Sequence, residues 1–221
     1  MAHSSTARRL DEPQTVRTLK RAGFGGGEPP APPVRPNTPI GNNAWLAVLV
    51  FLGAEAMFFA GLIGAYLVFR VGSPIWPPPF QPRLPIDVTG VNTVILLASA
   101  VTMRLGIRAL SAGNVRKMIR LLGLTASLGA AFLAIQGYEW FRLIQFGLTV
   151  SSSVYGGLFY ILIGFHGLHV VGALIWLLVV FALAKQGRFT KDRHVGVQTC
   201  GMYWTFVVGL WPVLYGLVYL Y

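Results

Sequence analysis

One long apolar stretch, residues 154–182, limits what this chain can fold into more than any other feature. It contains no Lys, Arg, Asp or Glu. It is long enough to cross a bilayer as a helix, because about 20 apolar residues at 1.5 Å rise span the hydrocarbon core. Two histidines, His166 and His169, lie near its middle. A polar side chain at that depth is costly without a partner, so this transmembrane helix must pack against other protein.

The rest of the chain extends this interpretation to an all-α, polytopic membrane protein. Charged residues make up 11% of the sequence, against about 25% in soluble domains. Five transmembrane helices are predicted, at about 44–69, 91–110, 117–146, 154–184 and 197–221. They form one domain, residues 41–221. Residues 1–40 are rich in Pro and Gly and basic, which predicts a disordered or surface-bound arm, either a solvated tail or a contact with a partner subunit or anionic lipid.

The net charge of +11 is explained by topology. With five spans, fifteen of the eighteen Lys and Arg residues fall on one side of the membrane, in the N-terminal arm and around residues 104–120 and 185–193. The positive-inside rule then predicts a cytoplasmic N-terminus and a C-terminus outside. The basic excess therefore gives no reason to expect binding to nucleic acid.

Glu55 is the single formal charge within the first predicted helix. A carboxylate near the bilayer centre costs about 2.5–3.5 kcal/mol on insertion scales, so it is either protonated or paired. The expected depths of the helices put Glu55 and His169 within about one helical turn of each other. We therefore predict that Glu55 contacts His169, or alternatively His166, with Tyr66 on nearly the same helix face. A proton-linked role and a purely structural carboxyl both remain open.

The two histidines are three residues apart and share one helix face, so they cannot bind a haem iron from opposite sides. A metal would need Glu55 or Glu139 as well, and packing histidines that bind no metal are the expectation.

Glu139 and Arg142, also three apart, predict an ion pair near the outer interface, the alternative being a contact with a partner. Small residues predict close helix approach or a lipid cleft, at Gly53, Ala60, Gly64, Gly164 and Gly167. Motifs typical of catalytic sites are absent from the sequence, so no catalytic residue is predicted.

Five ordered motifs resemble subunit III of haem–copper respiratory oxidases, the cytochrome c oxidase subunit III family. They are Glu55-Ala56-Met57-Phe58-Phe59, Leu84-Pro85 with the segment 92–99, Gln136-Gly137-Tyr138-Glu139-Trp140, Gly164-Phe165-His166-Gly167-Leu168-His169-Val170, and Tyr203-Trp204 with Phe206-Val207 and Trp211. The resemblance covers residues 44–221. Thr205 and Val208 stand where the family usually has His and Asp, which indicates a divergent member. The chain resembles the five-helix form, which lacks the first two of seven helices.

The resemblance implies a non-catalytic subunit of a terminal oxidase in the bacterial plasma membrane. Haem and copper would be held by partner subunits, and this chain would bind no cofactor except phospholipid. It would pack against subunit I, hold lipid and support proton uptake and enzyme stability, with Glu55 as the family's membrane-buried acid.

Two other classes of function stay open at this stage. An accessory subunit of a nitric oxide reductase, a quinol oxidase or a respiratory supercomplex would have the same fold. A proton-coupled transporter could use Glu55 and the histidines as a relay, although five helices permit no even inverted repeat. A haem-binding quinol module is disfavoured by the histidine geometry.

Overall fold

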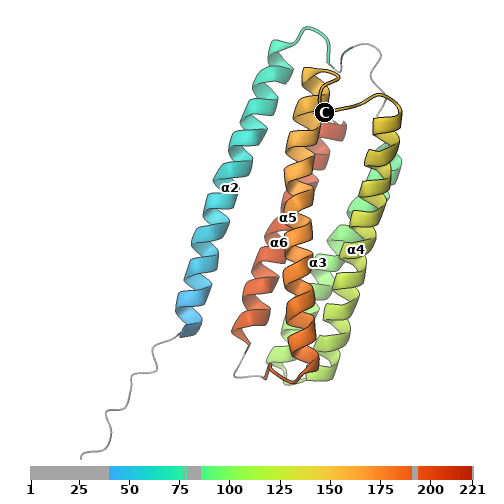
Figure 1. Cartoon of the computed structure of the whole chain (residues 1–221). Coiled ribbons are helices and arrows are strands. Elements are labelled where there is room, and N and C mark those ends of the chain that lie inside the picture. The colour runs from blue at the N-terminus through green and yellow to red at the C-terminus, as the bar shows by residue number, and fades with distance from the viewer. Residues whose placement is uncertain (1–39, 77, 79–85, 191–193, 221) are drawn as a thin grey trace, which may run out of the picture. The chain divides into compact units, whose positions relative to one another are not determined.

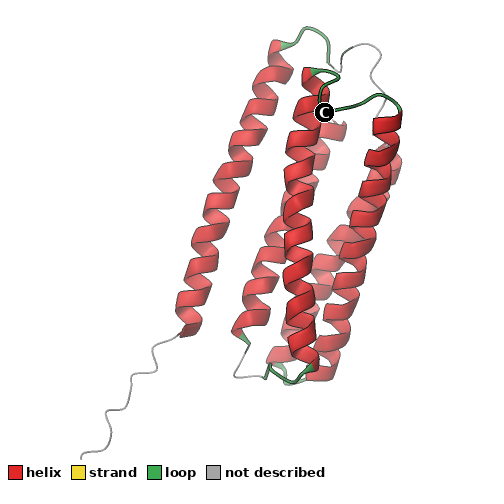
Figure 2. Cartoon of the chain, viewed as in Figure 1, coloured by secondary structure: helices red, strands yellow, loops and turns green. Residues whose placement is uncertain are grey.

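The computed structural model describes residues 40–76, 78, 86–190 and 194–220, and these residues form an antiparallel bundle of long helices without strands (Figures 1 and 2). The elements are α2 (Ile40–Gly72), α3 (Ile86–Ser111), α4 (Val115–Gln145), α5 (Val154–Lys185), α6 (Val195–Tyr215) and the π-helical turn η1 (Gly216–Leu220). The predicted arm, residues 1–40, lies outside the described residues apart from the backbone of Ile40.

Five of these helices are long and apolar enough to cross a membrane, which confirms the predicted all-α, polytopic fold. The predicted bounds are close for α5, whereas α3 begins at Ile86 instead of about residue 91. Its additional first turn contains Asp87. An acidic side chain there interacts favourably with the positive end of the helix dipole, so the charge does not prevent the helix from starting early.

Capping side chains fix where α4 and α5 begin. Asn114 caps α4 by accepting a hydrogen bond from the Lys117 backbone N–H at 3.0 Å. Ser153 caps α5 in the same way, accepting from the Gly156 backbone N–H at 3.1 Å. Between these helices, Gly147 has a φ of 87°, a backbone conformation that glycine adopts without strain. These turns place α4 and α5 side by side and antiparallel.

The helices are packed unevenly. The helices α3, α4, α5 and α6 form a compact group, which we call the core bundle, whereas α2 packs against α5 and α6 at its edge (Figure 1). Within the most apolar stretch of α2, 6% of residues are buried, compared with 44% in α6. The face of α2 that does not touch the core bundle is therefore left to lipid or to another protein.

Two glycines let the core helices approach closely, because a side chain at either position would overlap a neighbouring helix. A Cβ at Gly129 of α4 would overlap the Trp204 ring of α6, and a Cβ at Gly201 of α6 would overlap Ile107 of α3. Trp204 and Trp211 are the largest fully buried side chains of the described residues. Their indole N–H groups donate to Ser99 Oγ and Thr93 Oγ1, at 3.1 and 2.9 Å, so the core tryptophans tie α6 to α3.

Candidate functional site: intramembrane polar clusters

Glu55 on α2 and His169 on α5 form a pair across the helix interface, with 2.8 Å between Glu55 Oε2 and His169 Nε2. This is the contact that the sequence predicted. Each side chain keeps 16% of its surface exposed, so the pair lies at the edge of the bundle and not in its centre. Both residues are far from the helix ends, which places the pair at the depth of the hydrocarbon core.

The second ring nitrogen of His169 shows where the protons of this pair lie. His169 Nδ1 is 2.6 Å from the backbone carbonyl oxygen of Phe165. A carbonyl oxygen can only accept, so Nδ1 carries a hydrogen and donates it. The 2.8 Å contact at Nε2 then holds one further proton, either on Glu55 or on the imidazole. In both arrangements the pair has no net charge, which makes it tolerable within a membrane.

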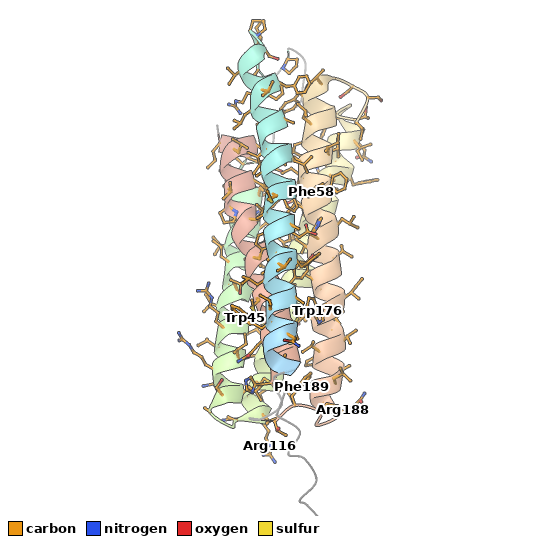
Figure 3. All side chains as sticks on the ribbon, turned by 90° about the vertical axis from the view of Figure 1, so that its left-hand side faces the viewer. Trp45, Phe58, Arg116, Trp176, Arg188 and Phe189 are labelled. Carbon is orange, nitrogen blue, oxygen red and sulfur yellow. The ribbon has the colours of Figure 1, made fainter. Side chains whose placement is uncertain are left out.

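Aromatic rings surround the pair on the side of α5. Phe59 is 1% exposed and lies edge-on to His169, with 5.1 Å between the ring centroids. Phe58, labelled in Figure 3 on the α2 helix, lies edge-on to Phe165 at 5.3 Å. The interface around the pair is therefore largely aromatic.

His166 lies about one turn before His169 on α5 and is more deeply buried. Its ring is fully buried and stacks on Trp211 with 5.1 Å between centroids. Neither of its ring nitrogens has a hydrogen-bond partner among the described residues. His166 is thus a packing residue, held between α5 and the Trp211 ring of α6.

Tyr66 joins α2 to the C-terminal end of the chain. It is fully buried, and its hydroxyl accepts a hydrogen bond from Arg70 at 3.2 Å. The same Arg70 nitrogen donates to the Leu217 backbone carbonyl in η1 at 3.2 Å. Tyr66 therefore belongs to an anchor at the C-terminal end of α2, separate from the Glu55 pair, and the guanidinium satisfies a carbonyl at the end of the last helix.

Glu139 forms the second polar cluster, between α3, α4 and η1. The Thr89 hydroxyl donates to Glu139 Oε2 at 3.0 Å, and the Gln136 amide donates to the same oxygen at 3.3 Å. The Gln136 amide also donates to the Tyr219 hydroxyl at 3.4 Å. Glu139 is 4% exposed. The carboxyl group is thus held by neutral donors in the interior of the core bundle.

The predicted ion pair between Glu139 and Arg142 does not form. Glu139 turns inward to Thr89 and Gln136, whereas Arg142 is exposed and lies over the Phe146 ring, 5.7 Å from its centroid. The spacing of three residues put the two side chains close along the helix. It did not reveal that Glu139 faces the interior, where Thr89 on α3 is its hydrogen-bond partner in place of Arg142.

The predicted small-residue positions fall into two groups. Gly167 faces the Trp140 ring, and a Cβ there would lie 3.2 Å from it, so this glycine does permit close packing of α4 and α5. No side chain or neighbouring backbone lies within 4 Å of a Cβ built at Gly53, Gly64 or Gly164, and Ala60 is exposed. Those four positions leave open surface on α2 and α5 instead of helix contacts within this chain.

The sequence analysis missed two buried polar residues of α3, of which Thr89 belongs to the Glu139 cluster. Thr89 and Asn92 are fully buried on α3, and the Asn92 amide donates to the Phe132 carbonyl at 3.2 Å. Their spacing of three residues along an apolar helix was the available signal. Of the two departures from the family pattern, Val208 is buried in the core, while Thr205 lines a groove between α2, α3 and α6.

The fold and these clusters define an all-helical, multi-pass membrane protein in which polar side chains from different helices pair with one another. The family model described as cytochrome c oxidase subunit III matches residues 37–221. The chain belongs to this family, which confirms the resemblance drawn from the five motifs.

Relatives of the chain carry the same description. It is 41% identical over 174 residues to "Cytochrome c oxidase subunit 3" of Synechocystis sp., covering 78% of this chain and 73% of the relative. It is 38% identical over 182 residues to the protein of that name from Corynebacterium diphtheriae, covering 80% of this chain and 88% of the relative. The relative from Hippopotamus amphibius is 33% identical over 178 residues, covering 78% of this chain and 67% of the relative.

Proposed function

We propose that this chain is the third, non-catalytic subunit of a haem–copper terminal oxidase. The observation that carries the proposal is the family match along the whole helical domain, which includes both polar clusters. Haem and copper would be bound by the partner subunits. In that complex the chain packs against the catalytic subunit, and the apolar, exposed face of α2 is the surface available for protein or lipid.

We place the chain in the bacterial plasma membrane with its N-terminus in the cytoplasm. The distribution of basic side chains supports this orientation, because Arg116 and Arg188 lie at the same end of the bundle (Figure 3). α2 begins at this end, and the C-terminal turn η1 lies at the opposite end (Figure 1). Under the positive-inside rule, the end with Arg116 and Arg188 faces the cytoplasm.

We further propose that a phospholipid occupies the groove between α2, α3 and α6. The groove has a volume of about 590 Å³ and lies toward the proposed cytoplasmic end. Apolar side chains line most of it, including Trp45, Leu52, Ile107 and Phe206, with Gln198 and Thr205 as polar groups. An acyl chain matches such a lining, and Thr205 provides a hydroxyl where the family pattern has an imidazole.

The Glu55–His169 pair supports a role in proton handling. The 2.8 Å contact between Glu55 and His169 is short enough for a proton to pass from one group to the other at the edge of the bundle. This role would be auxiliary. Oxygen reduction takes place in the partner subunit and does not require a group on this chain.

Purification in mild detergent tests the assignment as a subunit. We expect the chain to co-purify with haem-bearing partners whose absorption spectrum identifies the oxidase type. The co-purifying chains also distinguish a cytochrome c oxidase from a quinol oxidase, a nitric oxide reductase or a supercomplex. A colourless homo-oligomer would contradict the proposal and favour a proton-coupled transporter.

Replacement of the buried acid tests its auxiliary role. Glu55→Ala should leave the complex assembled, fully loaded with haem and able to reduce oxygen. The expected change is in the number of protons translocated per electron, or in the number of turnovers before inactivation. Loss of oxygen reduction in an intact, haem-loaded complex would show that Glu55 is needed for turnover.

A further inference from the structure

A cavity between α4 and α5 adjoins the Glu139 cluster, and its mostly apolar wall contains several polar side chains. It has a volume of about 280 Å³. Three of its polar lining residues are Gln136 and Trp140 from α4 and His166 from α5. The other walls are mostly apolar, and the cavity opens at the surface of the bundle, where its lining residues Leu168 and Val171 are exposed.

Each of these three polar side chains has a buried polar atom without a partner among the described residues. The atoms are Gln136 Oε1, Trp140 Nε1 and the two ring nitrogens of His166. Buried polar atoms in proteins are nearly always hydrogen-bonded, because an unpaired one costs about 1–3 kcal/mol. Their occurrence on three residues around one cavity indicates a common missing partner instead of three unrelated defects.

The chemistry of these atoms restricts what that partner is. Trp140 Nε1 can only donate and Gln136 Oε1 can only accept, while a neutral His166 ring offers one donor and one acceptor. A ligand that only accepts, such as a lipid ester, would leave Gln136 unpaired. A ligand that only donates would leave Trp140 unpaired. The missing partner must both donate and accept.

We propose that this cavity is a water site that joins His166, Trp140 and Gln136. A water molecule occupies about 30 Å³ in the liquid, and buried water typically makes about three hydrogen bonds. The cavity has room for more than one water, and its three polar residues limit how many are ordered. The polar atoms lie covered in the cavity wall. The proposal therefore requires the imidazole and the indole to rotate about χ2, a torsion with broad wells.

The water site extends the Glu139 cluster toward the middle of the membrane. Gln136 belongs to both features, because its amide nitrogen donates to Glu139 and Tyr219 while the residue lines the cavity. Water at its free oxygen therefore connects His166 through Gln136 to Glu139. The result is a continuous polar line in the half of the bundle that contains η1, separate from the Glu55–His169 pair.

Radiolytic footprinting of the purified oxidase complex tests the proposal, because hydroxyl radicals made from bound water oxidise the side chains next to it. His166 and Trp204 are matched in burial, at 0% and 1% exposure, but the Trp204 indole is already paired with Ser99. We expect oxidation of His166 to exceed that of Trp204 several-fold, although tryptophan is intrinsically the more reactive residue. Equal protection of the two residues would overturn the proposal.

A matched pair of glycine variants on α5 links the signal to the cavity. Gly164 lines it and has free space at its Cβ position, so Gly164→Leu should fill the cavity and reduce His166 oxidation several-fold. Gly172 also has free space but does not line the cavity, so Gly172→Leu should leave the oxidation unchanged. An unchanged His166 signal in Gly164→Leu would contradict the proposal.

A cryo-EM map of the wild-type complex, detailed enough to show ordered water, provides a test without variants. We expect isolated density within hydrogen-bond distance of Trp140 Nε1 and a ring nitrogen of His166. An empty cavity, a continuous acyl chain or a partner side chain in its place would overturn the water site. None of these results would alter the assignment of the chain as an oxidase subunit.

Discussion

The edge helix α2 and the interior of the core bundle each contain one intramembrane acid, and they accommodate it differently. Glu55 on α2 faces an imidazole and keeps 16% of its side-chain surface exposed. Glu139 is 4% exposed, and it accepts hydrogen bonds from the neutral donors Thr89 and Gln136. The edge acid faces a single basic partner, whereas the interior acid is built into a hydrogen-bond network.

This difference separates two roles that an intramembrane acid can have. A proton shared with His169 can move by a short transfer without rearranging the helices. The Glu139 network links α3, α4 and η1, so a change in its hydrogen bonding is a change in how those helices pack. We therefore assign the functional role to the edge and the structural role to the interior, and four substitutions test the assignment.

The largest effect is expected from Glu139→Leu. It removes the acceptor for the Thr89 hydroxyl and the Gln136 amide within the bundle, and each buried group left unpaired costs about 1–3 kcal/mol. The thermal midpoint for release of this chain from the complex should fall clearly. Glu139→Gln retains an acceptor oxygen of similar shape and should lose much less. Equal losses in the two variants would show that the charge of Glu139, and not its hydrogen bonding, stabilises the bundle.

A smaller loss of stability is expected from Gly129→Ala, which introduces a Cβ into the Trp204 ring. Overpacking of this kind costs about 1–3 kcal/mol. Gly53→Ala on α2 is the matched control, because its Cβ enters open space. The two proteins should differ in the same thermal release assay. If Gly53→Ala were equally destabilising, α2 would be packed against a partner at this glycine.

The anchor at the C-terminal end of α2 should contribute less, because Arg70 is only half-buried. Arg70→Ala removes the hydrogen bonds to Tyr66 and to the Leu217 carbonyl. We expect a loss of about 0.5–1.5 kcal/mol, the usual net value of a hydrogen bond. Proteolysis near the C-terminus should increase in this variant before the complex dissociates. Unchanged proteolysis would mean that η1 is held by the core bundle alone.

The sequence predicted the edge of the molecule better than its interior. Apolar runs and the depth of Glu55 and His169 were sufficient for the helices and for that pair, because the bilayer fixes depth along each helix. The inward direction of Glu139 was not predictable in the same way, because it depends on the rotation of α4 against α3. That rotation is set by contacts such as Gly129 against Trp204, which single-sequence spacing does not show.

The smallest effect on stability is expected from Glu55→Gln, and it sharpens the comparison most directly. The glutamine amide can donate to His169 Nε2 while Nδ1 continues to donate to Phe165, so the packing of α2 against α5 is retained. The thermal midpoint should stay close to that of the wild type, within about 0.5 kcal/mol as for other non-disruptive changes. The amide, however, cannot take up the shared proton. Proton translocation or turnover lifetime should therefore change in Glu55→Gln but not in Glu139→Gln, and the reverse pattern would exchange the roles of the two acids.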